Sequence, residues 1–224
     1  MESAPASLRA VAALGDFFDL TQPAPPGALT LGGFARDPAA IRAAIDRTRA
    51  TLGARAGLAA DAIDGRAAAS LVHLGLVARI VSPVLGASAL LGTVPFRAEA
   101  LVVHRTDAGR LILSAARGDG TSDVIHVVDI LGELGAGFRA ASQLSPIVMW
   151  GSCGSAIASA VAIVTRALPG HALAGRSAAD DLLARPELRP TGAYVDGAWR
   201  RTSCCLYYRI PGGGLCGDCV LNPS

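Results

Sequence analysis

The segment from Ser70 to Phe96 is the most apolar in the chain and constrains the fold more than any other segment. In a helical conformation, its first half would be apolar in nearly every direction. The residues responsible are Leu71, Leu74, Leu76, Val77, Ile80 and Val81. Such a helix must be covered on all sides, so we expect it at the centre of the core. We also expect it to end at Pro83, because proline disfavours the helical conformation of the residue before it.

Two polar side chains, His73 and Arg79, lie in this apolar helix. Both need partners if they are buried, because an unpaired polar group inside a protein is unfavourable. For His73 we favour a hydrogen bond within a packed layer of helices over a role as a metal ligand, since no second ligand lies at helical spacing from it.

Neither of the two most apolar segments has the form of a membrane span. A spanning helix needs about 20 uninterrupted apolar residues. Ser70–Phe96 contains charged residues and prolines, and Gly151–Leu168 is short and broken by Arg166. We therefore expect buried helices and no stable membrane span. The N-terminal stretch carries Glu2 and Asp16 and lacks the regions of a signal peptide, so we expect a cytoplasmic protein.

The charge pattern argues against nucleic acid as a partner. The 224 residues include 20 basic and 18 acidic ones without a basic run, whereas a nucleic-acid-binding domain carries clustered positive charge. Every basic residue is an arginine, which excludes a lysine-based mechanism. With 51% hydrophobic residues, the chain can bury a full core.

Cap and loop signals predict two helices before the apolar segment. A Pro- and Gly-rich loop, Thr21–Gly33, follows a short first helix. A second helix should begin at Asp37 and Pro38 and end near Leu52, because Asp is a good N-cap and Pro fits the first helical position.

Extended runs and turns organise the middle of the chain. The runs Ala100–Arg105 and Arg110–Ala115 flank a turn at residues 107–109 and predict an antiparallel hairpin. A third extended run, Val124–Val128, should lead into a helix that ends near Ser142.

Two further elements are expected after Pro146. The apolar letters IVMW, at residues 147–150, predict a short strand that runs into a helix. A last helix should be capped by Ser177, with Asp180 and Asp181 in its first turn, where acidic side chains suit the helix dipole.

The stretch WGSCGS places Cys153 at the position of a nucleophile on a sharp turn between strand and helix. A thiolate nucleophile also needs a base, and none of the four histidines lies in a motif that would bring one here. We therefore favour a packing role, in which small residues allow close approach at the start of a helix.

The other four cysteines, Cys204, Cys205, Cys216 and Cys219, are spaced C-C-x10-C-x2-C. Disulfides are the least favoured use of them, because thiols stay reduced in the cytosol. Zinc suits the C-x2-C pair, but adjacent cysteines in extended backbone point to opposite sides and chelate one ion poorly.

An iron-sulfur cluster with two irons relaxes this geometric constraint. Its four thiolate positions span two metals, so neighbouring cysteines can approach from different directions. Pro211 and the three glycines after it can wrap a loop closely around the sulfurs. The spacing favours a cluster over zinc and leaves both open.

The stretch RRTSCCLYYRIPGGGLCGDC resembles the C-terminal signature of the FhuF-type ferric siderophore reductases. Two upstream stretches are similar to the same family: LSPIVMWGSCGSAIASA to its Trp-Gly segment, and LVHLGLVARIVSPVLGA to its central helix. The resemblance runs from Leu71 to the end of the sequence, and Ser152 stands where the family usually has Asn.

By this resemblance, Cys204, Cys205, Cys216 and Cys219 hold a [2Fe-2S] cluster, and the protein reduces ferric iron held in a siderophore. Hard oxygen donors bind Fe(III) far more tightly than Fe(II). Transfer of one electron would therefore weaken the complex and release the iron.

The electron donor is expected to be a separate protein, either a ferredoxin or an NAD(P)H-linked reductase. No G-x-G-x-x-G fingerprint of a dinucleotide site follows a predicted strand. The partial match LGARAG, at residues 52–57, follows a predicted helix instead.

Arginine and aromatic side chains near the cysteines are candidates for substrate binding. Arg201 and Arg209 would attract an anionic chelate, and Trp150, Tyr207 and Tyr208 would pack against it or shield the cluster. Such residues are more often solvated charges and rings that cover the core. Their concentration in a chain with 4% aromatic residues modestly strengthens the case for a functional role.

We therefore expect a single, mostly helical α+β domain with a small antiparallel sheet. Residues 1–198 would form the scaffold and the substrate-binding part, and residues 199–224 an irregular [2Fe-2S]-binding segment. The expected function is that of a ferric-siderophore reductase that releases Fe(II). The alternatives are a non-redox siderophore-binding or interaction protein stabilised by zinc or a cluster, and a plain electron carrier.

Overall fold

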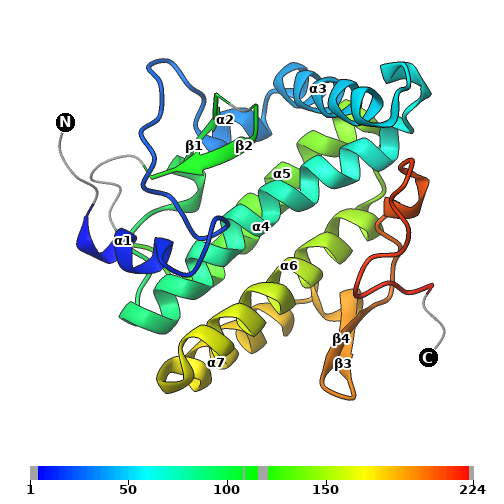
Figure 1. Ribbon diagram of the computed structural model, residues 1–224. Coiled ribbons are helices and arrows are strands. Elements are labelled where there is room, and N and C mark those ends of the chain that lie inside the picture. The colour runs from blue at the N-terminus through cyan, green and yellow to red at the C-terminus, as the bar shows by residue number, and fades with distance from the viewer. Residues whose placement is uncertain (1–4, 108, 116–120, 222–224) are drawn as a thin grey trace.

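The structure is a computed structural model that describes residues 5–107, 109–115 and 121–221, and helices dominate it (Figure 1). The helices are α1 Ala6–Ala12, α2 Leu31–Ala35, α3 Pro38–Ala56, α4 Gly65–Leu91, α5 Val127–Ser142, α6 Pro146–Ala167 and α7 Ala172–Leu183. The strands are β1 Val102–Arg105, β2 Leu111–Ser114, β3 Gly192–Val195 and β4 Ala198–Arg201. The expected mostly helical α+β domain is confirmed.

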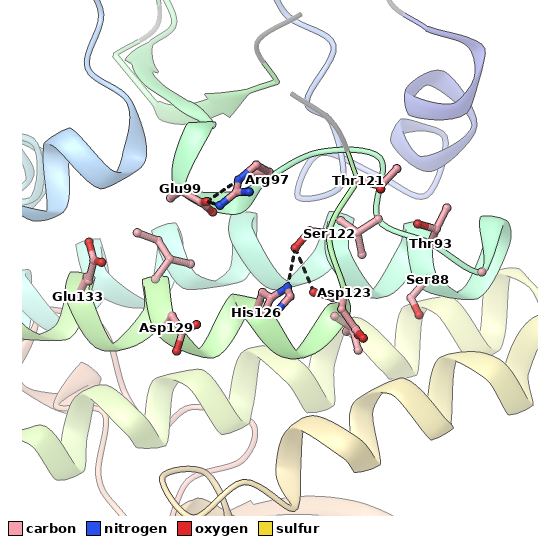
Figure 2. Close-up of a pocket in the computed structure, with 14 residues that line it drawn as sticks. Ser88, Thr93, Arg97, Glu99, Thr121, Ser122, Asp123, His126, Asp129 and Glu133 are labelled. Carbon is pink, nitrogen blue, oxygen red and sulfur yellow. Dashed lines mark hydrogen bonds and ion pairs between the residues drawn. The ribbon is translucent and has the colours of Figure 1, made fainter. Parts of the chain in front are cut away.

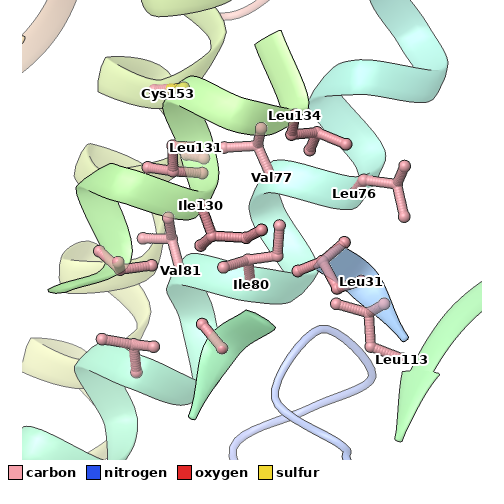
Figure 3. Packing of buried hydrophobic residues seen from close by; sticks show 14 of the residues in the cluster. Leu31, Leu76, Val77, Ile80, Val81, Leu113, Ile130, Leu131, Leu134 and Cys153 are labelled. Carbon is pink, nitrogen blue, oxygen red and sulfur yellow. The ribbon is translucent and has the colours of Figure 1, made fainter. Parts of the chain in front are cut away.

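Helix α4 runs through the middle of the molecule and is covered on several sides (Figure 1). Helices α3 and α5 pack on one side of it, and α6 and α7 on the other. Figure 3 shows its side chains meeting those of α5, with Leu31 of α2 and Leu113 of β2 beside them. Val77, Ile80 and Leu85 are completely buried. The central position predicted for this helix is therefore confirmed.

Pro83 does not end α4, contrary to the sequence-based expectation, because the helix continues to Leu91 and stops at Gly92 in the left-handed conformation. A proline inside a helix costs about 3 kcal/mol, since it removes one hydrogen bond and crowds the preceding turn. Burial of Val84 and Leu85 after the proline contributes about 1.5–3 kcal/mol for each side chain. Burial thus outweighs the local cost of the proline.

The predicted start of α3 is confirmed in atomic detail. Asp37 accepts hydrogen bonds from the backbone N–H groups of Ala39 and Ala40, and Pro38 occupies the first turn. The helix extends beyond Leu52 to Ala56, where Gly57 ends it with a φ of 67°. The loop before it is shorter than predicted, since α2 begins within the expected loop.

The predicted hairpin is also confirmed. Strands β1 and β2 pair antiparallel, with Val102 opposite Ser114 and Arg105 opposite Leu111. Of the predicted turn, Ala108 lies outside the described residues, and Gly109 has a φ of 79°. Strands β3 and β4 form a second two-stranded antiparallel sheet that was not anticipated.

Three local predictions are wrong, and each concerns a short segment. Residues 124–126 form a turn of 3-10 helix that leads into α5 rather than an extended run. Residues 147–150 belong to α6, whose first residue is Pro146. Ser177 lies inside α7, which begins at Ala172. Short apolar runs fit a strand and a buried helix equally well, so packing on α4 decides between the two.

Two helices, α4 and α6, are long and apolar enough to cross a membrane. Of the most apolar 18-residue stretch in each helix, 61% is buried inside the protein in α4 and 67% in α6. Such burial is usual for the core helices of a folded domain, so length and composition alone do not establish a membrane span.

His73 is completely buried in α4 and has no hydrogen-bond partner at either ring nitrogen, in contrast to the expected hydrogen bond. Its ring meets the edge of Phe138 at a centroid distance of 5.1 Å. Burial lowers the pKa of His73 to about 3, because the charged form would lose its hydration. Arg79 does find a partner, since its Nη1 donates to the backbone oxygen of Asp16 at 2.9 Å.

Gly137 marks the closest approach between α5 and α2. A Cβ atom at this position would overlap the backbone oxygen of Ala35 and the end of Ile41. We expect Gly137→Ala to lower the free energy of unfolding by about 2 kcal/mol, because a backbone oxygen cannot yield as a flexible side chain can. Urea unfolding measures the change.

Gly132→Ala on the same helix is the matched control, because a Cβ there would meet no atom within 4 Å. Ala is the better helix former, so this variant should gain about 0.5–1 kcal/mol. Equal effects of the two substitutions would contradict the packing of α5 on α2.

His73 should make the protein less stable as the pH falls. The folded protein keeps the ring neutral down to a pKa of about 3, whereas the unfolded chain binds a proton near the ordinary value of 6.5. The free energy of unfolding should therefore drop by about 2 kcal/mol between pH 7 and pH 5 through this residue alone. His73→Leu should remove that part of the difference in urea titrations at both pH values.

The exposed His171 provides the control for this pH effect. His171→Gln should retain the stability difference of the unmodified protein. If His73→Leu leaves the difference between pH 7 and pH 5 intact, the buried neutral state of His73 is wrong.

Candidate metal centre

The C-terminal segment, residues 202–221, is irregular and lies against α4 and α6 (Figure 1). Ser70 Oγ of α4 donates a hydrogen bond to the backbone oxygen of Cys205 at 2.8 Å. Ser203 Oγ donates to the backbone oxygen of Ile147 in α6 at 3.1 Å. These bonds join the segment to helices that are far away in the sequence.

Two acidic side chains add to this attachment. Asp64 caps the start of α4 and also pairs with Arg209, at 3.1 Å between Oδ2 and Nη1. Asp218 accepts a hydrogen bond from Ser155 of α6. The sequence contains no signal for these contacts, because each joins residues that are separated by 63 positions or more.

Helix α6 presents a surface of small residues to the end of the chain. A Cβ atom at Gly151 would overlap Ser203, and one at Gly154 would overlap the hydroxyl of Thr191. The glycines of WGSCGS therefore permit close packing, as expected, although they lie inside a helix rather than at a turn.

Cys153 does not have the environment of a nucleophile. Its side chain is 1% exposed inside α6, and burial raises the pKa of its thiol to about 12. A reactive cysteine needs a lowered pKa and access to substrate. The structure thus agrees with the packing role predicted for this residue.

The four remaining cysteines all belong to the C-terminal segment, and none of them forms a disulfide within the described part of the chain. The sulfur atoms of Cys205 and Cys216 lie 3.4 Å apart. Cys205 and Cys219 are buried, whereas Cys204 and Cys216 are partly exposed. The adjacent Cys204 and Cys205 thus differ in exposure, in keeping with side chains that point in different directions.

Backbone N–H groups approach two of these sulfur atoms. The N–H of Leu206 donates to Cys204 Sγ at 3.3 Å, and the N–H of Leu221 donates to Cys219 Sγ at 3.4 Å. Such donors stabilise negative charge on sulfur. The backbone around both cysteines is therefore suited to thiolates that bind a metal.

Within residues 5–107, 109–115 and 121–221, no three His, Cys, Asp or Glu side chains are grouped closely enough to hold a metal ion. The sulfur atoms of Cys205 and Cys216 form a close pair. Burial raises the pKa of Cys216, and the neighbouring Cys205 and Asp218 raise it further. Neighbouring thiolates thus need a cation to compensate them, which is the role of a metal in a thiolate site.

A cavity of about 430 Å³ opens beside the paired cysteines. Its walls come mainly from apolar residues of α4 and α6, and Cys205 and Cys216 line it together with Arg201 and Tyr207. We call it the cysteine cavity. Two of the five residues predicted to bind substrate therefore lie in the same cavity wall as cysteine side chains.

Arg201 has an unusual environment in this wall. Its side chain is 3% exposed, and neither Nε nor Nη2 has a hydrogen-bond partner. Its backbone N–H donates to the oxygen of Asp218 at 3.3 Å, which holds the end of β4 beside the cysteines. A buried, unpaired guanidinium attracts negative charge into its surroundings.

The other three predicted substrate residues lie elsewhere. Trp150 lines a separate cavity of about 230 Å³ with His73 and Cys153. Tyr208 is exposed, and Arg209 contacts it with Nε 3.2 Å from the phenol oxygen. The structure therefore does not bring these three side chains into the cysteine cavity.

A larger hollow, of about 630 Å³, lies near the other end of α4 and is lined by none of the cysteines (Figure 2). Its wall carries several acidic side chains together with Arg97 and His126. Arg97 donates to Glu99 at 2.7 Å, and Ser122 Oγ lies 3.4 Å from Nδ1 of His126. These polar groups are already paired with one another, and sequence reasoning did not identify this hollow.

Comparison with known proteins concerns the C-terminal segment. No curated protein matches the chain. Residues 201–221 match the family model described as the FhuF 2Fe-2S C-terminal domain, and this range includes all four clustered cysteines. The resemblance noted in the sequence is confirmed for this segment, which is similar to the FhuF 2Fe-2S C-terminal domain over residues 201–221.

Proposed function

We propose that the protein is a cytoplasmic ferric-siderophore reductase that holds a [2Fe-2S] cluster through Cys204, Cys205, Cys216 and Cys219. The match to the FhuF 2Fe-2S C-terminal domain carries this proposal, because it covers these four cysteines. The cysteine cavity supports it, since the sulfur atoms of Cys205 and Cys216 line a space that is open to a ligand.

Four thiolates and two backbone donors suit such a cluster. When bound, a [2Fe-2S] cluster supplies reversible transfer of a single electron. The N–H groups of Leu206 and Leu221 would stabilise negative charge on the ligand sulfurs. The positive charge of Arg201 in the cavity wall would act in the same direction.

The protein positions the site through its attachment to α4 and α6. The hydrogen bond from Ser70 holds the backbone of Cys205 on the central helix, and that from Ser155 holds Asp218 beside Cys216 and Cys219. The apolar walls of the cysteine cavity limit the access of water to the sulfurs. Residues 1–198 would supply most of the cavity wall and the substrate-binding part, and residues 199–224 the redox centre.

The reaction transfers one electron and forms no bond to the protein. Fe(III) in the siderophore gains the electron and becomes Fe(II), and an external donor such as a ferredoxin or an NAD(P)H-linked reductase loses one. Fe(II) is larger and less charged than Fe(III), so oxygen donors hold it less tightly and other ligands can take it.

Replacement of a cluster ligand should be visible without any substrate. Cys216→Ser should abolish the visible absorption of the anaerobically purified protein and lower its content of iron and acid-labile sulfide, because one of four thiolates is lost. Cys153→Ser is the matched control, since Cys153 lies inside α6 and should not bind the metal. A colourless unmodified protein that contains one zinc ion would contradict the cluster.

Iron reduction should follow directly from reduction of the protein. Protein reduced with dithionite, freed of excess reductant and mixed with a ferric siderophore should be reoxidised while a ferrous chelator captures iron. The stoichiometry should approach one Fe(II) per electron, as read from the absorption of the captured iron. An intact cluster that reduces no ferric siderophore would instead indicate a plain electron carrier.

A further inference from the structure

Five arginine side chains, from two helices and the β1–β2 hairpin, surround a groove of about 360 Å³. The five are Arg47 and Arg55 of α3, Arg79 of α4, Arg105 of β1 and Arg110, which directly precedes β2. No acidic side chain is among the described residues that line this groove, and its floor is apolar. We call it the arginine groove. Residues separated by many positions in the sequence thus form one concentrated region of positive charge.

The arginine groove adjoins the cysteine cavity across helix α4. Phe17 and Leu71 line both hollows. In Figure 1, α3 and the β1–β2 hairpin lie on one side of α4, and α6 and the C-terminal segment lie on the other. The two hollows therefore adjoin at Phe17 and Leu71.

Only part of the positive charge in this groove is compensated. Asp16 pairs with Arg110 at 3.0 Å, and its backbone oxygen accepts a hydrogen bond from Arg79. The side chains of Arg47 and Arg55 are exposed and form no hydrogen bond or ion pair within the described part of the chain. The groove thus keeps an excess of positive charge that an anion would neutralise.

The mutual effects of the arginines agree with this excess. Burial lowers the pKa of Arg105, and the neighbouring Arg47 lowers it further. Burial likewise lowers the pKa of Arg79, and the neighbouring Arg110 lowers it further, whereas Asp16 and Asp19 act in the opposite direction. Like charges that are held close together repel one another, and a bound anion relieves this repulsion.

We propose that the arginine groove binds the outer part of an anionic ferric chelate of the tris-catecholate class. The metal centre on the other side of Leu71, next to the cysteine cavity, would then reduce the iron of this chelate. This inference rests on the proposed function and specifies its substrate. Three doubly charged catecholates around Fe(III) leave a triply negative complex, whereas three singly charged hydroxamates leave a neutral one. Only the first complex gains from a groove lined by arginines.

The shape and the chemistry of the groove favour such a chelate over an acidic donor protein. A concave site with an apolar floor takes flat aromatic rings, and guanidinium groups stack on such rings as well as pairing with their oxygens. Phe17 is 42% exposed and already lies under the guanidinium of Arg79, 4.7 Å from it, at the boundary between the two hollows. A catecholate ring would extend this pairing of aromatic ring and arginine.

Gallium(III) complexes test binding separately from reduction, because Ga(III) has nearly the size and charge of Fe(III) but is not reduced by the protein. Calorimetric titration of the full-length protein should show tighter binding of gallium(III) enterobactin, a tris-catecholate, than of the neutral gallium(III) desferrichrome. The affinity for the tris-catecholate should fall as salt rises from 50 to 500 mM, since screening weakens the interaction between exposed charges.

The double variant Arg47→Gln, Arg55→Gln removes two exposed charges from one helix face. We expect it to weaken binding of the gallium tris-catecholate about tenfold at low ionic strength and to leave the neutral complex unaffected. The matched control is Arg166→Gln, Arg185→Gln, which removes the same charge from two exposed positions outside the groove. This control should bind both complexes as the unmodified protein does.

The possible outcomes test binding in the arginine groove separately from the proposed reductase function. Tight, arginine-dependent binding of the gallium complex without reduction of its iron counterpart would support the groove as the binding site and contradict the proposed reductase function. Equal affinity for both complexes would overturn the groove as the binding site, even if the protein reduces ferric chelates. An equal loss of affinity for the tris-catecholate in the two double variants would overturn it as well. An effect of the groove variant on electron uptake from a ferredoxin alone, with unchanged gallium binding, would also overturn it and indicate a docking surface for the donor.

Discussion

Burial of helix α4 on nearly all sides is the constraint on which the rest of the structure depends. It accounts for a proline inside the helix and for a histidine without a hydrogen bond, because the apolar area removed from water outweighs each local cost. The position of α4 also determines where two of the hollows lie. The cysteine cavity and the arginine groove use different sides of the same helix and share Leu71. The helix is thus both the centre of the core and the wall between two candidate binding regions.

The parts of the fold that the sequence predicted are those in which local signals decide the conformation. Asp37 and Pro38 start α3 through contacts within four residues, and the hairpin of β1 and β2 forms around a short turn. The failures concern segments where local signals are balanced. Residues 147–150 suit a strand or a helix, and packing against α4 selects the helix. The prediction that the helix ends at Pro83 failed, because burial of the residues after Pro83 outweighs the local preference of proline against a helix.

The candidate site likewise has residues that the sequence predicted and residues that it did not. The cysteine spacing and the resemblance it carries are contained in about 20 residues, so sequence alone identified the segment that the family model matches. Arg201 was identified because it lies next to this segment. Ser70, Ser155 and the arginines of the groove were not identified, because they join the site only after α3, α4, α6 and the hairpin have come together. No local pattern distinguishes them from the other serines and arginines of the chain.

The attachment of the C-terminal segment also bears on how the metal centre would be assembled. Its bonds to the scaffold join residues separated by 135 positions, from Ser70 to Cys205, and by 145, from Asp64 to Arg209. Contacts of such long range form late, because the entropy of closing a large loop must be overcome before they contribute. Helices α4 and α6 would therefore be in place before the cysteines reach their final positions. Maturation of the metal centre would then be coupled to docking of this segment on α4 and α6.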